Sequence, residues 1–589
     1  MERPAKRARV SPDSIRAKDS NRSTASASLA SLHRSVTPPP RTRSRQPLAL
    51  DLACPELPND HIKGRRDGVA PTEAPKAPRI ISSPFQLTHI HDLPSQRGHN
   101  VDTVKLRDIL GDPMIRECWQ FNYLFDVDFL MAHFDEDVRS LVQVKVVHGS
   151  WERESANKVR VDEACSRHPN VEAIVAYMPE RFGTHHSKMM ILLRHDDLAQ
   201  IVIHTANMIH QDWANMTQAV WRSPLLPLQK AGASSSQTHS AIGTGTRFKR
   251  DLLSYLKAYG AKKTGALVQQ LNRYDFGEIR AALVASVPSK QKYNSLDSDK
   301  STLWGWPALR DLISRVPILQ PEGEKGDSNQ TKKPHIVIQI SSVASLGQTD
   351  KWLNDVFFNS LAPKSTHPRP KYSIIFPTPD EIRRSLDGYM SGGSIHMKIQ
   401  SAPQQKQLQY LRPHLCHWAG DGPSDPKLLD LSDDPLVKRE AGRGRAAPHI
   451  KTYIRYSDAG SMDIIDWAMV TSANLSTQAW GAATNASDEV RISSWEIGVV
   501  VWPELFTDDF VPGRSASASP ECPPVLMVPC FQRDKPATLP ESLTEYEPDT
   551  VVGLRMPYDL PLVPYSAADE PWCATATHDI PDWRGRTWI

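Results

Sequence analysis

The stretch Arg181-Phe182-Gly183-Thr184-His185-His186-Ser187-Lys188-Met189-Met190 decides how the rest of the chain is interpreted. It places His186 two residues before Lys188, and the pair runs into the apolar segment 189–193, which is typical of a buried strand. Residues two apart on a strand point to the same face, so we expect both side chains to reach one phosphate. A single His-x-Lys tripeptide is weak evidence, because a chain with 21 histidines and 70 lysines and arginines contains such tripeptides by chance.

A second copy of the pair, His449 and Lys451, heads another β-prone segment at 450–454. Each copy is followed by a strand-like unit that ends in an asparagine, Asn207 after 21 residues and Asn474 after 25. A tryptophan stands six residues after each asparagine, as Trp213 and Trp480. The sequence therefore contains an internal repeat of a whole site.

Length and composition indicate a multidomain protein of a reducing compartment. At 589 residues with 39% hydrophobic residues, the chain is too long for one core but apolar enough for two or three globular domains. Its seven cysteines include no C-x-x-C pair, which argues against a disulfide framework or a zinc site. The N-terminus lacks the apolar segment of a secretory signal, and no apolar run of about 20 residues predicts a membrane-spanning helix.

Residues 1–82 differ from the rest and are predicted to be a disordered basic tail. They are rich in Ser, Pro and Arg, and residues 1–50 hold 11 basic and 3 acidic residues, a charge of +8. Since the whole chain carries +3, residues 51–589 carry −5, and any nucleic acid must be held by local basic groups or by the tail. The run Lys6-Arg7-Ala8-Arg9 resembles a nuclear localisation signal, so we expect a nuclear protein; the alternative is a solvated basic tail that carries no address.

Strand-like and helix-like segments alternate from residue 83 onward, which favours α/β/α layers. We place an N-terminal domain at 83–292 and a C-terminal domain at 293–589, with a low-complexity insertion at 231–245. The predicted helices are 105–110, 248–259 and 308–316. The predicted strands include 141–147, 171–178, 218–221, 334–340, 372–376 and 490–502.

With these motifs in view, the chain from Phe85 onward resembles the tyrosyl-DNA phosphodiesterases of the phospholipase D superfamily. The motifs that carry the resemblance are Phe-Gly-Thr-His-His-Ser-Lys-Met-Met at 182–190, Ile-His-Thr-Ala-Asn at 203–207, Pro-His-Ile-Lys-Thr-Tyr at 448–453 and Val-Thr-Ser-Ala-Asn-Leu-Ser at 470–476. The resemblance implies two similar phospholipase D-like α/β/α domains packed around a pseudo-two-fold axis. The general superfamily motif continues H-x-K-x4-D, but this chain has Leu193 and Tyr456 at the aspartate positions. The family shares that departure, which argues against a lipid-cleaving enzyme.

The resemblance implies a DNA repair phosphodiesterase that hydrolyses the bond between a DNA 3′-phosphate and a tyrosine, as in stalled topoisomerase I adducts, and other 3′-blocking groups. The implied partners are single- and double-stranded DNA 3′ ends that carry a tyrosyl peptide, with no membrane partner and a monomeric enzyme. His186 would attack phosphorus to form a phosphohistidine, and His449 would act as acid and then base. Lys188 and Lys451 would neutralise the phosphate oxygens, while Asn207 and Asn474 donate hydrogen bonds. We expect no metal ion and no cofactor.

Two further polar residues follow the asparagines, Gln218 after eleven residues and Glu496 after twenty-two. In the family they orient the histidines. Because a carboxylate raises the basicity of an imidazole, we expect Glu496 to hold His186, whereas the neutral Gln218 would hold His449 without adding charge. The alternative is that both are ordinary polar strand residues.

The predicted DNA contacts are Phe182, by stacking on a base, and Ser394 and Ser476, on phosphate. Residues 438–445 contain four basic residues that form either a basic strip or a solvated loop: Lys438, Arg439, Arg443 and Arg445. Three other functions stay open: a phospholipase D-type nuclease acting on ordinary nucleic-acid ends, a lipid phosphodiesterase, and an inactive DNA-end binding protein. The intact His-x-Lys pairs argue against the last.

Overall fold

The computed structural model describes residues 77–589 except 95–97, 151, 153–154, 231–240, 294–300, 320–332, 363–365, 420–437, 508–524 and 537–546. Ala74–Ile589 form one compact unit. The predicted disordered tail lies outside the described residues as far as position 76. Its end was wrong, however, because β1 (Arg79–Ile81) pairs in parallel with β22 (Thr550–Arg555), which also pairs with β21 (Val525–Cys530).

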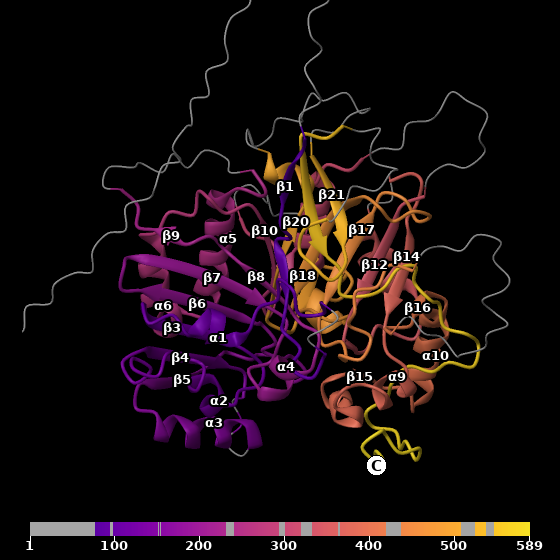
Figure 1. Ribbon diagram of the computed structural model, residues 1–589, viewed down its shortest axis with the longest axis horizontal. Coiled ribbons are helices and arrows are strands. Elements are labelled where there is room, and N and C mark those ends of the chain that lie inside the picture. Colours follow the sequence, from indigo (N-terminus) through magenta and orange to yellow (C-terminus); the bar gives the residue numbers. More distant parts are fainter. Residues whose placement is uncertain are drawn as a thin grey trace, which may run out of the picture. The chain divides into compact units, whose positions relative to one another are not determined.

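Two large sheets, one in each half of the unit, position the site (Figure 1). The first has the order β2-β8-β7-β6-β3-β4-β5, and β9 pairs beside β7. Its strands are β2 (Phe85–Leu87), β3 (Ile115–Phe121), β4 (Gln143–His148), β5 (Val171–Val175), β6 (Met189–Arg194), β7 (Leu198–His204), β8 (Ala219–Arg222) and β9 (Leu226–Pro227). The second has the order β10-β20-β18-β17-β12-β14-β16. Its strands are β10 (Ala282–Ser286), β12 (His335–Gln339), β14 (Lys371–Ile375), β16 (Leu415–Cys416), β17 (Thr452–Tyr456), β18 (Ile465–Thr471) and β20 (Glu496–Val501).

The two sheets match strand for strand in order and direction. In each, three strands run in parallel at one edge (β3, β4 and β5; β12, β14 and β16) and the remaining pairs are antiparallel. The register matches as well: the residue after each lysine, Met189 or Thr452, pairs with the residue four before each asparagine, Ile203 or Val470. The sequence repeat is therefore a structural repeat, and the expectation of two similar halves related by a pseudo-two-fold is confirmed.

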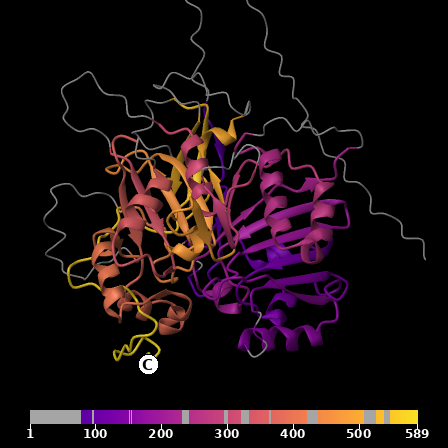
Figure 2. The same ribbon diagram turned by 180° about the vertical axis from the view of Figure 1, so that it is seen from behind.

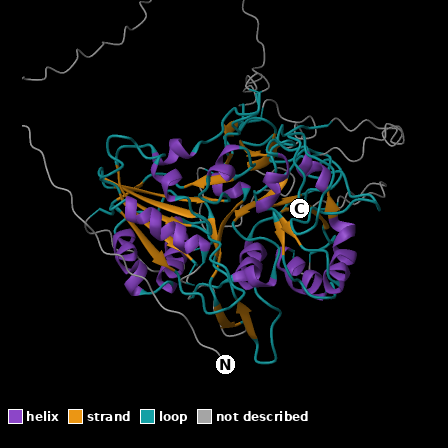
Figure 3. Ribbon diagram, turned by 90° about the horizontal axis from the view of Figure 1, so that it is seen from below, coloured by secondary structure: helices purple, strands orange, loops and turns teal. Residues whose placement is uncertain are grey.

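Helices cover both sides of the strands, as the view from below shows (Figure 3). In the first half they are α1 (Leu106–Leu110), α2 (Val127–Met131), α3 (Ala156–Arg167), α4 (His210–Ala214), α5 (Gly245–Ala258) and α6 (Ala261–Asn272). In the second half they are α7 (Gly305–Arg315), the π-helix η2 (Trp352–Phe357), α8 (Phe358–Leu361), α9 (Pro379–Arg383), α10 (Ala402–Leu411), α11 (Thr477–Trp480) and the 3₁₀ helices η3 (Gly388–Ser394), η4 (Arg412–His414) and η6 (Pro503–Phe506). No helix in the described part of the chain is long and apolar enough to cross a membrane.

The apolar strand β6 shows why the sequence forms a layered core. Its side chains alternate between two clusters: Met189, Ile191 and Leu193 join the core that also holds α5, α6 and the second sheet. Met190 and Leu192 join a separate core under α1, α2 and α3. A strand with helices on both faces must be apolar at every position, and β6 is buried throughout except at Arg194. The view from behind shows the two halves side by side (Figure 2).

Two sequence expectations need correction or refinement. The single strand predicted at 490–502 is two strands, because Ser493 and Ser494 separate β19 (Glu489–Ile492) from β20. β19 pairs with β11 (Ser289–Lys292) outside the main sheets, and the short pair β13 (Ser342–Val343) and β15 (His396–Met397) is separate as well.

β10 and β11, which precede the boundary expected at 292, already pair with strands of the second half. The division into domains at that residue stays a prediction, and 231–240 of the predicted insertion lie outside the described residues.

Candidate active site

The two His-x-Lys pairs lie just before strands β6 and β17 rather than on them, which corrects the expected location. Each pair is held by the opposite half. The His186 backbone N–H donates to the Trp495 carbonyl at 2.9 Å, and the His449 N–H donates to the Thr217 carbonyl at 3.2 Å. These acceptors are the residues immediately before Glu496 and Gln218. The site therefore forms only when the two halves pack together.

Close approach of the halves also explains Gly183, beside the first pair. A Cβ at this position would lie 2.0 Å from the Ser493 carbonyl oxygen, so any side chain would push the loop away. The adjacent Thr184 N–H donates to Ser494 Oγ at 3.1 Å. The break between β19 and β20 thus provides the residues that receive the first His-x-Lys loop.

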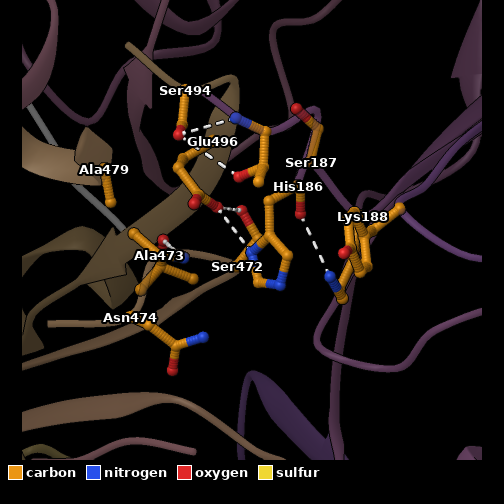
Figure 4. A network of polar contacts seen from close by, with 12 residues as sticks. His186, Ser187, Lys188, Ser472, Ala473, Asn474, Ala479, Ser494 and Glu496 are labelled. Carbon is orange, nitrogen blue, oxygen red and sulfur yellow. Dashed lines mark hydrogen bonds and ion pairs between the residues drawn. The ribbon is translucent and has the colours of Figure 1, made fainter. Parts of the chain in front are cut away.

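Glu496 holds His186, as the sequence predicts (Figure 4). The His186 Nδ1 lies 3.0 Å from Glu496 Oε2, and Ser472 Oγ donates to the same oxygen at 2.5 Å. Ser472 in turn accepts from the Ile497 N–H at 3.0 Å, so its proton points to the carboxylate. Because Nδ1 donates to Glu496, Nε2 of His186 is the nitrogen that carries a lone pair for reaction. Burial and Lys188 lower the pKa of His186 below its ordinary value, against the opposing effect of Glu496, which keeps the imidazole neutral.

Gln218 contacts His449, again as predicted, with Gln218 Nε2 3.0 Å from His449 Nδ1. Its partner Thr205 mirrors Ser472: Thr205 accepts from the Ala219 N–H and donates to Gln218 Oε1 at 2.7 Å. Gln218 is not the only partner of His449 Nδ1, however, because a carboxylate that the sequence did not predict lies beside it. The carboxylate of Asp212, which is buried in α4, places Oδ2 3.0 Å from the same Nδ1.

Lys188 and Lys451 are both 0% exposed, and each ammonium donates to the carbonyl oxygen of its own histidine. Burial lowers the pKa of Lys188 to about 8, although Glu496 and Asp212 oppose the shift. Burial and Lys188 together lower the pKa of Lys451 well below its ordinary value. Burial and mutual repulsion make the charged form of each lysine unfavourable. A bound phosphate would stabilise both ammonium groups, so the site is suited to bind an anion.

The two asparagines are anchored by different groups, Asn474 through its side chain and Asn207 through its backbone N–H. Asn474 Oδ1 accepts from the Ser341 and Ser342 N–H groups at 3.1 and 3.0 Å, so its amide NH₂ is left as a donor. The backbone N–H of Asn207 donates to Asp212 Oδ2 at 2.6 Å. Each asparagine follows the strand beside a His-x-Lys strand, β18 or β7, at equivalent positions. The structure thus brings all eight predicted catalytic residues into one site, although their roles stay predictions.

The three predicted DNA-binding residues lie on segments that adjoin those of the site. Phe182 is 78% exposed on the loop that leads to His186, with the Arg181 guanidinium 5.9 Å from its ring centroid. Ser394 ends η3, two residues before His396, whose N–H donates to the Ser341 carbonyl at 2.9 Å next to the Asn474 anchor. The third residue, Ser476, caps α11 by accepting from the Ala479 N–H at 3.0 Å.

Of the four basic residues considered for a strip at 438–445, Arg445 is exposed, whereas the other three are held by neighbouring groups. Arg443 is fully buried and donates to the carbonyl oxygens of Thr88 and His99, so it ties two segments together. Lys438 lies 3.4 Å from Asp559, and Arg439 lies 2.7 Å from Asp463.

Sequence reasoning missed three residues of the site. Thr205 and Ser472 occupy the same place in the repeat, two residues before each asparagine, so a comparison of the two copies could have found them. Asp212 stands five residues after Asn207, where the second copy has Ala479, and the repeat gives no signal for it.

Two matched halves, each contributing a histidine, a lysine and an asparagine to one buried anion site, define a phosphodiesterase of the phospholipase D type. A family model described as tyrosyl-DNA phosphodiesterase matches residues 84–566. The chain belongs to the tyrosyl-DNA phosphodiesterase family, and it is a hydrolase with a DNA repair function.

Individual relatives agree. The chain is 31% identical over 569 residues to a probable tyrosyl-DNA phosphodiesterase of Schizosaccharomyces pombe, covering 87% of this chain and 97% of the relative. It is 27% identical to tyrosyl-DNA phosphodiesterase 1 of Arabidopsis thaliana, over 86% of this chain and 77% of that protein. The crystal structure of the yeast tyrosyl-DNA phosphodiesterase matches with a TM-score of 0.54 at 20% identity, over 84% of this chain and 99% of that one, which supports the fold.

Proposed function

We propose that this enzyme hydrolyses the phosphodiester between a DNA 3′-phosphate and a tyrosine in two steps through a phosphohistidine on His186. The observation that carries the proposal is the pairing of two histidines, each fixed through Nδ1 by the opposite half, with two buried lysines. Topoisomerase I adducts are the proposed substrates, together with other groups that block a 3′ end.

In the first step, Nε2 of His186 attacks phosphorus and the bond from phosphorus to the tyrosine oxygen breaks. The leaving phenolate, whose acid has a pKa of about 10 in water, takes a proton from Nε2 of His449, which the negative charge of the bound phosphodiester stabilises as an imidazolium. In the second step, neutral His449 removes a proton from water, the resulting hydroxide attacks phosphorus, and the phosphorus–nitrogen bond breaks. The products are a DNA 3′-phosphate and free His186. Lys188, Lys451 and the Asn474 amide stabilise the charge on the phosphoryl oxygens throughout.

The test of this function is cleavage of a 3′-phosphotyrosyl oligonucleotide in the presence of EDTA. Because the two lysines and the asparagine amides can hold the phosphate without a metal ion, we expect full activity under chelation. The control is the same oligonucleotide without the tyrosine. Faster cleavage of the control would favour the ordinary nuclease, and loss of activity in EDTA that magnesium restores would contradict the phosphate site described above.

The pKa of Lys188 predicts an alkaline limit to substrate capture. As pH rises through about 8, free Lys188 loses its proton, so kcat/KM is expected to fall about tenfold per pH unit above that value. Bound phosphate favours the ammonium form, so kcat is expected to hold to a higher pH than kcat/KM. A pH series from 6 to 10 with the tyrosyl oligonucleotide measures both profiles, and a kcat/KM that stays level to pH 10 contradicts the prediction.

We propose that the basic run Lys6-Arg7-Ala8-Arg9 directs the protein to the nucleus. A deletion should stop at residue 76, since β1 begins at Arg79 and pairs with β22. The shortened enzyme is expected to cleave short oligonucleotides within about twofold of the full chain while its nuclear signal falls, measured with a fluorescent fusion. Replacing only Lys6, Arg7 and Arg9 by alanine should have the same effect on location. Unchanged nuclear accumulation in both variants would show that the run carries no address.

A further inference from the structure

The two halves of the site supply a carboxylate to each histidine in different ways. Val470 pairs with Val499 in one half, and Ile203 pairs with Trp221 in the other. Glu496 and Gln218 each lie three residues before these strand partners, so they are structural equivalents. Glu496 supplies a carboxylate to His186, whereas the amide of Gln218 supplies none to His449. Five residues after each asparagine the difference is reversed, with Asp212 in the first half and Ala479, which Figure 4 labels, in the second.

Asp212 is placed as the acceptor for His449. It is 0% exposed, and its Oδ2 lies 3.0 Å from His449 Nδ1, 2.6 Å from the Asn207 nitrogen and 3.3 Å from Gln218 Nε2. Thr205 donates to Gln218 Oε1, so the Gln218 NH₂ group must face Asp212 and His449. The Asp212 carboxylate can lie beside His449 Nδ1 only if Nδ1 carries a proton and donates it to Asp212. The Gln218 NH₂ group then donates to Asp212 as well. Nε2 of His449 is then the nitrogen that exchanges protons in the site.

The charges around His449 make this acceptor necessary. Lys451 lies two residues along the chain, and Lys188 faces the ring from the other half; both repel an imidazolium. Burial has the largest effect, and together they lower the pKa of His449 to about 4, while Asp212 is the group that raises it. Burial would raise the pKa of Asp212, but His449 and the Asn207 N–H hold it below its ordinary value, so the group stays a carboxylate. In the described part of the chain, Asp212 Oδ1 has no hydrogen-bond partner, so the contacts of this carboxylate with His449, Asn207 and Gln218 are all made through Oδ2.

We propose that Asp212 is the positioning residue of the acid-base histidine: it fixes the tautomer of His449 and stabilises the imidazolium that protonates the leaving group. The proposal rests on the proposed two-step function. Each histidine then has one carboxylate at Nδ1. For His186 this carboxylate is Glu496 at the start of β20, and for His449 it is Asp212 in helix α4. Gln218 then orients Asp212 as much as it orients His449.

The first test uses Asp212→Asn, which keeps the size of the side chain and removes its charge. Single-turnover rates are measured with a 3′-phosphotyrosyl oligonucleotide and with a 3′-nitrophenyl phosphate ester, whose leaving group needs little protonation. We expect a loss on the order of 100-fold with tyrosine and less than about fivefold with nitrophenol. Equal losses with both substrates, or no loss with either, would overturn the proposal, because a merely structural residue does not sense the leaving group.

The second test transfers the design of one half to the other. Asp212→Ala with Gln218→Glu reproduces the pair Ala479 and Glu496, and it should recover at least about tenfold of the activity that Asp212→Ala alone loses on the tyrosyl substrate. Gln218→Glu alone sets two carboxylates beside each other and should reduce activity. Melting temperatures of all variants verify that they fold. An absence of rescue in a folded double variant would contradict the proposal.

The two proposals fail differently. A wild-type enzyme that does not cleave the tyrosyl oligonucleotide overturns the proposed function and, with it, the role of Asp212. A wild-type enzyme that cleaves, combined with an Asp212→Asn variant that cleaves as fast, overturns only the role of Asp212.

Discussion

Replacing His186 by alanine is expected to abolish turnover, with a loss on the order of 10⁴-fold or more in kcat. His186 is the histidine whose Nδ1 is held by Glu496 at 3.0 Å and whose neutral form is favoured by burial and Lys188. Without its Nε2 the enzyme has no nucleophile for phosphorus, and water would need a separate base. The measurement is the rate of tyrosine release from a 3′-phosphotyrosyl oligonucleotide under single-turnover conditions.

A neighbouring histidine provides the matched control. His195 is exposed on the turn between β6 and β7, and its replacement by alanine should leave the rate within about twofold of wild type. The His186→Ala variant should still bind the substrate, because Lys188, Lys451 and Asn474 remain. If the folded His186→Ala variant kept more than a hundredth of wild-type turnover, His186 would not be the nucleophile.

Replacing His449 by alanine is expected to separate the two steps. His186 can still attack, so a nitrophenyl ester should release nitrophenol in a rapid burst, whereas tyrosine, a poor leaving group, should be released about 10²- to 10⁴-fold more slowly. After the burst, the covalent enzyme lacks a base for water and should persist. Stopped-flow absorbance at the nitrophenolate band follows the burst, and an amplitude near one equivalent per enzyme is the expected result. Steady release without a burst would mean that His449 is not needed for the second step.

The sequence alone predicts most of this fold because the two copies of the motif carry their own strands. The apolar residues at 189–193 and the β-prone segment at 450–454 indicate the central strands β6 and β17, and the asparagines mark where the neighbouring strands β7 and β18 end. Gln218 follows its asparagine by eleven residues and Glu496 by twenty-two, although the two residues occupy equivalent positions in the sheets. The larger spacing to Glu496 arises because β19 and its flanking turns are inserted between α11 and β20, while the register stays the same.

The features that the sequence did not predict are those created by contact between the halves. The break at Ser493 and Ser494 is set by the loop of Thr184, which is more than 300 residues away in sequence. β1 contains only three residues and forms a strand because β22 provides its partner. Asp212 looks like an ordinary helix residue until the second half brings His449 against it. Contacts of this kind leave no periodic or repeated pattern in the sequence, so only the three-dimensional structure shows them.

The location of the covalent bond tests the central claim most directly. The His449→Ala enzyme is mixed with a labelled oligonucleotide that carries a 3′-nitrophenyl phosphate, the reaction is stopped in denaturant at neutral to alkaline pH, and the DNA-linked protein is digested and mapped by mass spectrometry. We expect one adduct, a phosphoryl group on the imidazole of His186, and none when His186 is also replaced by alanine. An adduct on any other residue, or its absence from a variant that still releases nitrophenol in a burst, would contradict a phosphohistidine at this site.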